Sequence, residues 1–341
     1  MVSWFDESRL DDETVLAGAD LRLRTLAESG ARVRREAHEA AQVTADLVAR
    51  DLPRPRAVIA AGPDSRLLRA VLEPWCPVPF VAWPNPGLPG WVGSLDLVVM
   101  LAPEGSDHGS ASAVAEAVRR GAHVVVACPE RSLVAEHAAG RDTTILPTVT
   151  GDQLATAVVV LDYLSHVDLC PGADAETVAT ALDEVATACS PHRDLAVNPA
   201  KMLAIAMADT NPVLWGGSVL AARAARRVAE SVRRASGRSA IAGDAEHLLP
   251  LLEATRQRDV FEDPFAEESP ELRPLLLILD DGSDDHVVRE QAGILRAAAA
   301  SRGVRVETIS TQVDAEVARY ASLLLTGTYA AEYLRIGLVE D

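Results

Sequence analysis

The four cysteines are the residues that would first suggest metal or redox chemistry, and their spacing argues against both. Cys76, Cys128, Cys170 and Cys189 lie far apart, and no two of them form the Cys-x-x-Cys spacing that a zinc or redox site uses. We therefore expect small core residues at these positions and no metal site.

Asp107 and His108 are neighbouring titratable residues in a predicted loop. They follow the apolar run LDLVVML at residues 95–101, so the loop lies at the carboxyl end of a predicted strand, where α/β proteins place their sites. A histidine beside a carboxylate is suited to acid-base chemistry or to ligand binding. A solvent-exposed turn is the alternative, and the sequence leaves both open.

The charge of the chain argues against several classes of partner. Fifty acidic residues against thirty-two basic ones leave a net charge of −18 over 341 residues, which repels nucleic-acid phosphates and anionic lipid. A transcription factor would also need a basic face, so we expect no nucleic-acid binding. The N-terminal stretch MVSWFDESRLDDET is acidic, unlike a secretory signal, and no apolar run approaches the roughly 18–20 residues of a membrane span. We expect no membrane association and a cytoplasmic protein.

The elements that would hold these residues follow a repeating pattern. Residues 12–50 have apolar positions three and four apart, which predicts two helices with a break at Gly30. Short apolar runs then alternate with helical spacing, and the predicted strands are RAVIAAG (56–62), VPFVAW (78–83), LDLVVML (95–101), HVVVACP (123–129) and TTILP (143–147). This alternation is typical of a parallel sheet covered on both faces, so the predicted fold class is α/β.

The same architecture recurs in the second half. A helical stretch from 152 to about 190 leads to SPHRDLAVNPAK, whose prolines mark a boundary. The strands predicted beyond it are NPVLWGG (211–217), RSAIAG (238–243), RPLLLILDDG (273–282) and VRVETIS (304–310). The acidic stretch 259–272 is predicted to be an exposed connection or a lid. The predicted division is N-terminal helices 1–50, a first α/β domain 51–150, a helical linker 151–197 and a second α/β domain 198–341.

Residues 198–227, NPAKMLAIAMADTNPVLWGGSVLAARAARR, resemble the sequence that opens the second sugar-isomerase (SIS) domain of the bifunctional phosphoglucose/phosphomannose isomerase family. Three further stretches agree with that family in the same order: PNPGLPGWVGSLDLVVML (84–101), DDHVVREQAGILRAAAASRGVRVETI (284–309) and ASLLLTGTYAAEYL (321–334). The resemblance covers most of the chain. It identifies the chain as a divergent, shortened branch of that family, similar to the proteins called TobH.

The resemblance implies two SIS domains, each a three-layer α/β/α sandwich with a mainly parallel five-stranded sheet, in a homodimer without a cofactor. The family interconverts aldose and ketose 6-phosphates by moving a proton between C1 and C2. That chemistry needs a carboxylate base, an acid-base group for ring opening and donors for the phosphate.

The resemblance places the substrate-binding residues in loops that follow strands: Ser65, Gly105, Ser106, Gly216, Gly217 and Ser218. The family's phosphate loop is rich in hydroxyl groups, whereas Ala102, Glu104 and Asp107 stand at the corresponding positions here. A carboxylate near a phosphate is repulsive. The loop therefore suits a neutral or amino sugar, or it is a solvated helix start.

The resemblance also implies the catalytic candidates. Glu246 and Glu253 are the candidates for the base, and His286 is the candidate for ring opening. The family's Asn-His-Asn-Glu segment is replaced here by AIAGDAEHLLPLLEA, which does not distinguish the two glutamates. Both glutamates are equally compatible with an ordinary amphipathic helix, and the acidic residues before His286 with a helix cap. The family's lysine-bearing tail has no counterpart after LRIGLVED.

Two functions from different classes follow. One is a SIS-domain protein with degenerate catalytic loops that binds a sugar phosphate or related carbohydrate without catalysis. The alternative is an active isomerase that interconverts glucose 6-phosphate or mannose 6-phosphate with fructose 6-phosphate. Lys201, the single lysine among thirty-one arginines, is expected to be structural, because Asn198 can cap its helix and Pro199 can take the first helical position.

Overall fold

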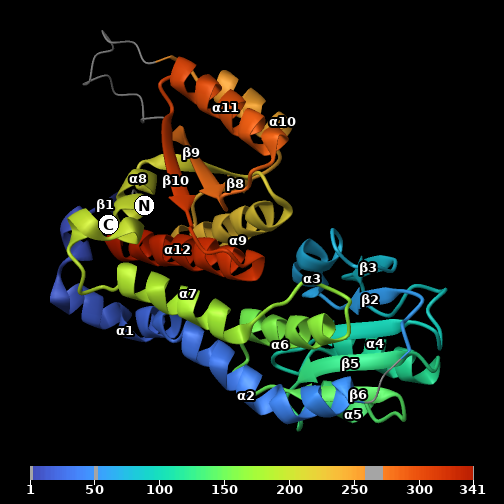
Figure 1. The fold of residues 1–341 in the computed structure, drawn as a ribbon. Coiled ribbons are helices and arrows are strands. Elements are labelled where there is room, and N and C mark those ends of the chain that lie inside the picture. Colours follow the sequence, from blue (N-terminus) through green and yellow to red (C-terminus); the bar gives the residue numbers. More distant parts are fainter. Residues whose placement is uncertain (1–2, 50–52, 258–271, 341) are drawn as a thin grey trace. The chain divides into compact units, whose positions relative to one another are not determined.

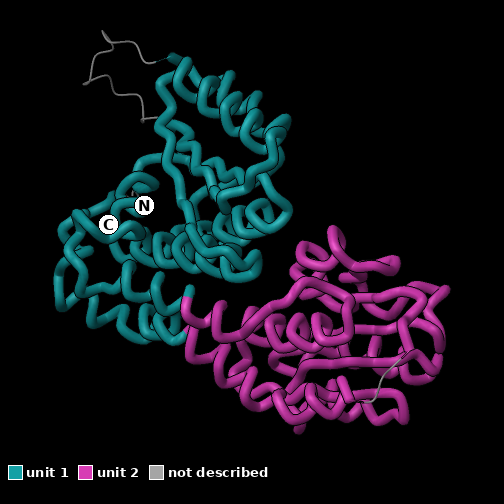
Figure 2. Tube along the Cα trace, viewed as in Figure 1, with its two compact units in different colours: residues 1–28, 181–341 teal, residues 29–180 magenta. Residues whose placement is uncertain are grey.

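The computed structural model describes residues 3–49, 53–257 and 272–340. The chain forms two compact units, unit 1 with residues 1–28 and 181–341 and unit 2 with residues 29–180 (Figure 2). The four-part division made from the sequence stays a prediction. The acidic stretch predicted at 259–272 lies outside the described residues, apart from Leu272.

Unit 2 carries the first series of strands and helices, followed by the start of a helix that continues into unit 1. Its elements are α2 (Ser29–Val48), β2 (Val58–Ala61), α3 (Ser65–Leu72), β3 (Phe80–Trp83), β4 (Leu97–Leu101), α4 (His108–Arg119), β5 (His123–Cys128), α5 (Leu133–His137), β6 (Thr143–Pro147), α6 (Gln153–His166) and the first part of α7 (Ala175–Ala188) (Figure 1).

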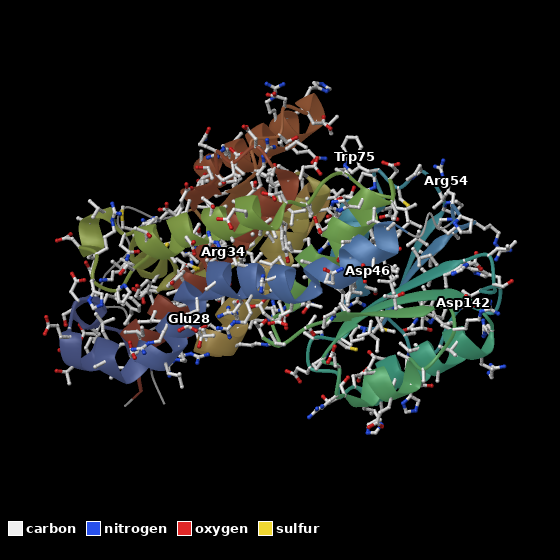
Figure 3. All side chains as sticks on the ribbon, turned by 60° about the horizontal axis from the view of Figure 1, so that its bottom comes forward. Glu28, Arg34, Asp46, Arg54, Trp75 and Asp142 are labelled. Atoms are coloured by element: carbon white, nitrogen blue, oxygen red, sulfur yellow. The ribbon has the colours of Figure 1, made fainter. Side chains whose placement is uncertain are left out.

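The sheet of unit 2 is parallel and has five strands in the order β3-β2-β4-β5-β6. Successive residues of a strand point to opposite faces, and Val98 and Val99 of β4 are both fully buried. Both faces of the sheet are therefore covered, as the apolar runs predicted. On the surface of this unit, Arg34 of α2 forms an ion pair of 2.8 Å with Glu176, and Arg54 and Trp75 are exposed (Figure 3).

Unit 1 combines the two ends of the chain with the second series. Its elements are β1 (Ser3–Phe5), the 3-10 helix η1 (Glu7–Leu10), α1 (Glu13–Ala27), the remainder of α7, η2 (Leu195–Val197), α8 (Pro199–Met207), β7 (Thr210–Gly216), α9 (Val219–Ser236), β8 (Ile241–Ala242), α10 (Ala245–Glu253), β9 (Arg273–Asp280), α11 (His286–Ser301), β10 (Arg305–Ser310), α12 (Glu316–Gly337) and β11 (Leu338–Glu340) (Figure 1).

The main sheet of unit 1 is also parallel, with four described strands in the order β10-β9-β7-β8. The long helix α12 packs against α8 and α9 and is buried along most of its length. A separate antiparallel pair joins β1 to β11, so the two ends of the chain meet. That pairing was not predicted.

Two details of the prediction are wrong. The break between the first two helices lies at Glu28, and Gly30 is buried inside α2, because tertiary packing outweighs the roughly 1 kcal/mol that a helical glycine costs. A five-stranded sheet was expected in each half, but the main sheet of unit 1 has four strands among the described residues, since the chain passes from β10 through residues 311–315 directly into α12. Across residues 3–49, 53–257 and 272–340, no helix combines the length and apolar composition that crossing a bilayer requires.

Candidate functional site

The loops that follow β2 and β4 meet at the carboxyl edge of the unit 2 sheet. β2 and β4 are neighbouring parallel strands, so their loops lie at the same edge. Gly62 has φ +87°, and a Cβ added there would lie 2.7 Å from the Met100 Sδ and 3.3 Å from the Ser110 Oγ. The structure therefore brings the loop of Ser65 against the end of β4 and the first turn of α4.

Asp107 caps the helix whose N-terminus faces this edge. Its Oδ2 accepts a hydrogen bond of 2.6 Å from the Ser110 backbone N–H in the first turn of α4. The Ser110 backbone N–H, helped by the Ser110 hydroxyl, holds the pKa of Asp107 below its ordinary value of 3.8. The Asp107 side chain is therefore ionised near neutral pH and takes the place that an anionic ligand would take at this helix end. The neighbouring His108 is exposed.

The predicted binding residues of unit 2 differ in accessibility. Ser65 is 1% exposed, and its Oγ has no hydrogen-bond partner within the part of the chain that the structure describes. Gly105 has φ +66°, and a Cβ there would collide with the Ser132 side chain, so a glycine is needed where the loops after β4 and β5 come close. Ser106 is exposed, so its hydroxyl is the accessible one of the two serine hydroxyls.

The corresponding loop of unit 1 joins β7 to α9. A Cβ on Gly216 would collide with the Ala221 backbone, and one on Gly217 would collide with the Val288 side chain of α11, so close packing explains both glycines. Ser218 caps α9, with its Oγ accepting from the Ala221 N–H at 3.0 Å, and its hydroxyl donates to a carboxylate oxygen of Asp281. The hydroxyl is therefore already used within the chain.

Asp281 is the residue at this edge that the sequence reasoning missed. It follows β9, is 9% exposed, and sets a carboxylate beside the N-terminus of α9. The signal was present as an Asp-Asp-Gly turn after a long apolar strand, where a carboxylate at the end of a buried strand is enclosed by its neighbours.

The predicted catalytic residues are open to solvent. The side chains of Glu246, at the start of α10, and of His286, at the start of α11, are each 82% exposed. Glu253, the last residue of α10, is also exposed. Helices α10 and α11 pack together, but no ion pair in the described residues joins either glutamate to His286, whose nearest carboxylate is that of Glu290 at 3.9 Å.

The thiols and carboxylates do not form a metal centre in the described residues, where no group of three or more His, Cys, Asp or Glu side chains could hold a metal ion. Burial raises the pKa of the Cys128 thiol and raises that of Cys189 to about 12. Both thiols are therefore protonated near neutral pH, which makes them poor ligands and poor nucleophiles.

A hollow lies elsewhere in unit 1. A groove of about 750 Å³ is lined by α7, α8, β10, the loop after β10 and α12. None of the residues predicted for the site lines it.

The family models and solved structures give a consistent comparison. Residues 196–337 match the family described as bacterial phospho-glucose isomerase C-terminal SIS domain. Among curated proteins, no sequence matches the chain significantly.

Solved structures share the fold at low sequence identity. Tagatose-6-phosphate ketose/aldose isomerase from Escherichia coli has a TM-score of 0.63 at 12% identity, covering 92% of this chain and 90% of that one. The C-terminal domain of glucosamine-fructose-6-phosphate aminotransferase from Francisella tularensis has a TM-score of 0.57 at 11% identity, covering 91% and 97%. A glucose-6-phosphate isomerase-like protein from Thermus thermophilus has a TM-score of 0.51 at 16% identity, covering 89% and 91%. The family match is thus confined to residues 196–337, and the solved structures show that their fold extends over most of the chain.

Proposed function

We propose that this protein binds a carbohydrate derivative through its SIS domains and does not catalyse aldose-ketose isomerisation. The exposure of the candidate acid-base side chains carries the proposal, since those of Glu246 and His286 are each 82% exposed. A base that removes a proton from carbon needs a site that excludes water and adjusts its pKa. A glutamate and a histidine open to solvent on helix surfaces do not supply such a site.

The helix ends at the two sheet edges favour a ligand that presents hydroxyl groups rather than a phosphate there. Asp107 caps α4, the Ser218 hydroxyl at the start of α9 is bonded to Asp281, and Asp285 caps α11 by accepting from the Val287 N–H at 2.8 Å. A phosphate at any of these three ends would meet a carboxylate at short range, which is repulsive. We propose that the exposed Ser106 hydroxyl binds a sugar hydroxyl at the edge of the unit 2 sheet, where Ser65 and Gly105 shape the loops. Gly216, Gly217 and Ser218 shape the corresponding loop of unit 1.

The finer assignment rests on the sequence resemblance. The 198–227 segment favours a divergent TobH-like branch of the bifunctional phosphoglucose/phosphomannose isomerase family, and it lies within the region that matches the SIS-domain model. We propose a cytoplasmic homodimer on the same ground. Light scattering coupled to size-exclusion chromatography tests the dimer.

The test combines turnover with binding. Coupled isomerase assays use fructose, glucose and mannose 6-phosphates, and thermal shifts use the same three sugars together with unphosphorylated fructose and glucosamine. Ligand that binds the native state raises the melting temperature. We expect no turnover and a rise with at least one sugar, reduced in Ser106→Ala and retained in Ser301→Ala, which alters an exposed serine on α11.

Two results would contradict the proposal in different ways. Turnover that disappears in His286→Ala and in one of Glu246→Gln or Glu253→Gln would establish the alternative, an active isomerase. If none of the five sugars shifts the melting temperature at millimolar concentration, the proposal of carbohydrate binding is wrong.

A further inference from the structure

The groove of unit 1 lies beside an unpaired strand edge. β10 is the last strand of its sheet and pairs only with β9 among the described strands. The groove has a volume of about 750 Å³, and residues 307–310 of β10 form one of its sides. The edge of the sheet therefore forms part of the groove wall.

Unit 2 shows what fills the equivalent place in the other sheet. β5 is the fourth strand of the unit 2 series, and β10 is the fourth strand of the unit 1 series. β5 pairs with a fifth parallel strand, β6. Helices α2 and α6 pack together beside β6, as α8 and α12 pack together beside the groove. Leu146 of β6 is fully buried there. The groove of unit 1 thus occupies the position of a missing fifth strand.

The backbone of β10 is oriented to accept such a strand. The Thr311 N–H donates to the Asp280 carbonyl of β9, and in a parallel ladder alternate residues bond to the same neighbour. The backbone N–H and C=O groups of Thr308 and Ser310 therefore face away from β9, and both residues are exposed and line the groove. Among the described strands nothing pairs with this edge, so these groups are available as donors and acceptors, as on other edge strands.

The groove has an apolar floor. Val185, Leu203 and Ile309 line it, together with Cys189.

The rim of the groove is acidic. The titratable side chains among its lining residues, apart from the thiol of Cys189, are the carboxylates of Glu184, Glu307 and Asp314, and no lining residue is basic. Glu307 is paired with Arg305 at 2.7 Å, whereas no ion pair in the described part of the chain involves Glu184 or Asp314. Arg319, the cation closest in sequence to Asp314, donates to the Val313 carbonyl and does not line the groove.

We propose that this groove binds a basic, amphipathic polypeptide segment of a partner protein in extended conformation, which adds to β10 as a fifth strand. Main-chain hydrogen bonds to Thr308 and Ser310 hold the segment, and alternate side chains contact the apolar floor. Its arginine or lysine side chains face Glu184 and Asp314. A second copy of this chain is a poorer occupant, because its net charge of −18 repels an acidic groove.

The probe is a fluorescein-labelled nine-residue peptide in which arginine alternates with valine and leucine, titrated with the full chain and followed by fluorescence anisotropy. We expect saturable binding that weakens as salt is added. The same peptide with glutamate in place of arginine, and one with N-methyl groups on alternate backbone amides, should each bind at least tenfold more weakly.

The decisive variant is Thr308→Pro, matched with Thr308→Ala. Both remove the hydrogen bond of 3.0 Å between the Arg296 guanidinium and the Thr308 Oγ1, but only the proline removes the N–H that faces the groove. We expect Thr308→Pro to weaken binding at least tenfold and Thr308→Ala to stay within about twofold of the unmodified chain. Glu184→Gln and Asp314→Asn should each weaken it several-fold. Circular dichroism checks that each variant is folded. If Thr308→Pro does not fold, the N-methylated peptide tests whether main-chain hydrogen bonds hold the segment.

Three results would overturn the proposal. The first is no saturable binding up to 1 mM peptide. The second is equal binding by the proline and alanine variants, or by the N-methylated peptide, which would mean charge attraction without strand addition. The third is a chain that does not bind the peptide but forms a concentration-dependent dimer, where Thr308→Pro abolishes the dimer. That result would assign the groove to a second copy.

Discussion

The ammonium group of Lys201 lies 2.5 Å from the Asp11 Oδ1, across 190 positions of sequence. Its Nζ also donates to the carbonyl oxygens of Pro191 at 2.9 Å and Arg193 at 3.0 Å, and the Tyr333 ring centroid lies 5.7 Å away. Lys201 is fully buried, and all three of its donors are used. The lysine therefore joins the N-terminal segment to α8 and has no proton donor left for a ligand.

Replacing this lysine should destabilise unit 1. Lys201→Met leaves the Pro191 and Arg193 carbonyl groups and the Asp11 carboxylate without their donor, and we expect a loss of roughly 2–4 kcal/mol in the free energy of unfolding. Urea denaturation followed by circular dichroism measures it. Arg24→Met, which removes an exposed ion pair with Asp20, should cost less than about 1 kcal/mol. Equal effects of the two variants would show that the Lys201 contacts do not stabilise the fold.

A buried carboxylate has the corresponding role in unit 2. Glu36 of α2 accepts from the backbone N–H of Val149 at 2.9 Å, and from the N–H of Thr150 at 2.6 Å and its hydroxyl at 2.5 Å. Glu36→Ala leaves those donors without an acceptor, so we expect a loss of about 2–4 kcal/mol. Glu39→Ala, on the exposed side of the same helix, is the control and should change stability by less than about 0.5 kcal/mol.

Gly62 should tolerate alanine less well than Gly151. Both have positive φ, +87° and +70°, so alanine costs about 1–2 kcal/mol at either position. A Cβ at Gly62 would also lie 2.7 Å from the Met100 Sδ, whereas nothing lies within 4 Å of one at Gly151. Thermal melts should therefore show a larger fall in Tm for Gly62→Ala. A larger fall for Gly151→Ala would contradict the close packing of the loop after β2.

The cap on α4 should have a definite pH dependence. Asp107→Ala removes the acceptor for the Ser110 N–H, and a lost cap costs about 1 kcal/mol. The pKa of Asp107 is lower in the folded chain than its ordinary 3.8, so its charge stabilises the fold above that pH, and this contribution is lost as the pH falls through the folded value. The stability difference between Asp107→Ala and the unmodified chain should be full at pH 6–7 and should shrink below about pH 4. A difference that grows on acidification would contradict the assignment.

The exposed candidates should be dispensable for ligand binding. Glu246→Gln and His286→Ala remove side chains that are 82% exposed, so we expect the thermal shift with any sugar that binds the unmodified chain to be unchanged. Ser106→Ala, tested in parallel, should reduce it. A shift lost in either α10 or α11 variant would place the ligand at those helices instead of at the loop after β4.

Local interactions account for what the sequence alone determined. Uninterrupted apolar runs predicted the central strands β4 and β9, because strands buried on both faces are built mainly of apolar side chains. Asn198 caps α8 by accepting from the N–H groups of Ala200 and Lys201, with Pro199 at the first helical position, as predicted from four adjacent residues. The repulsion of anions by the loop at Asp107 could likewise be predicted, since the carboxylate and the helix that it caps are neighbours in sequence.

Tertiary structure decided the features that depend on distant partners. The acceptor of Lys201 comes from residue 11, the donor to Asp281 from Ser218, and the edge of β10 is free because no fifth strand packs on it in the described chain. The exposure of Glu246 and His286 depends on how helices α10 and α11 pack, and residue spacing does not fix that packing. Sequence spacing records which groups share a turn or a face, whereas burial, long-range partners and grooves exist only once the elements have packed together.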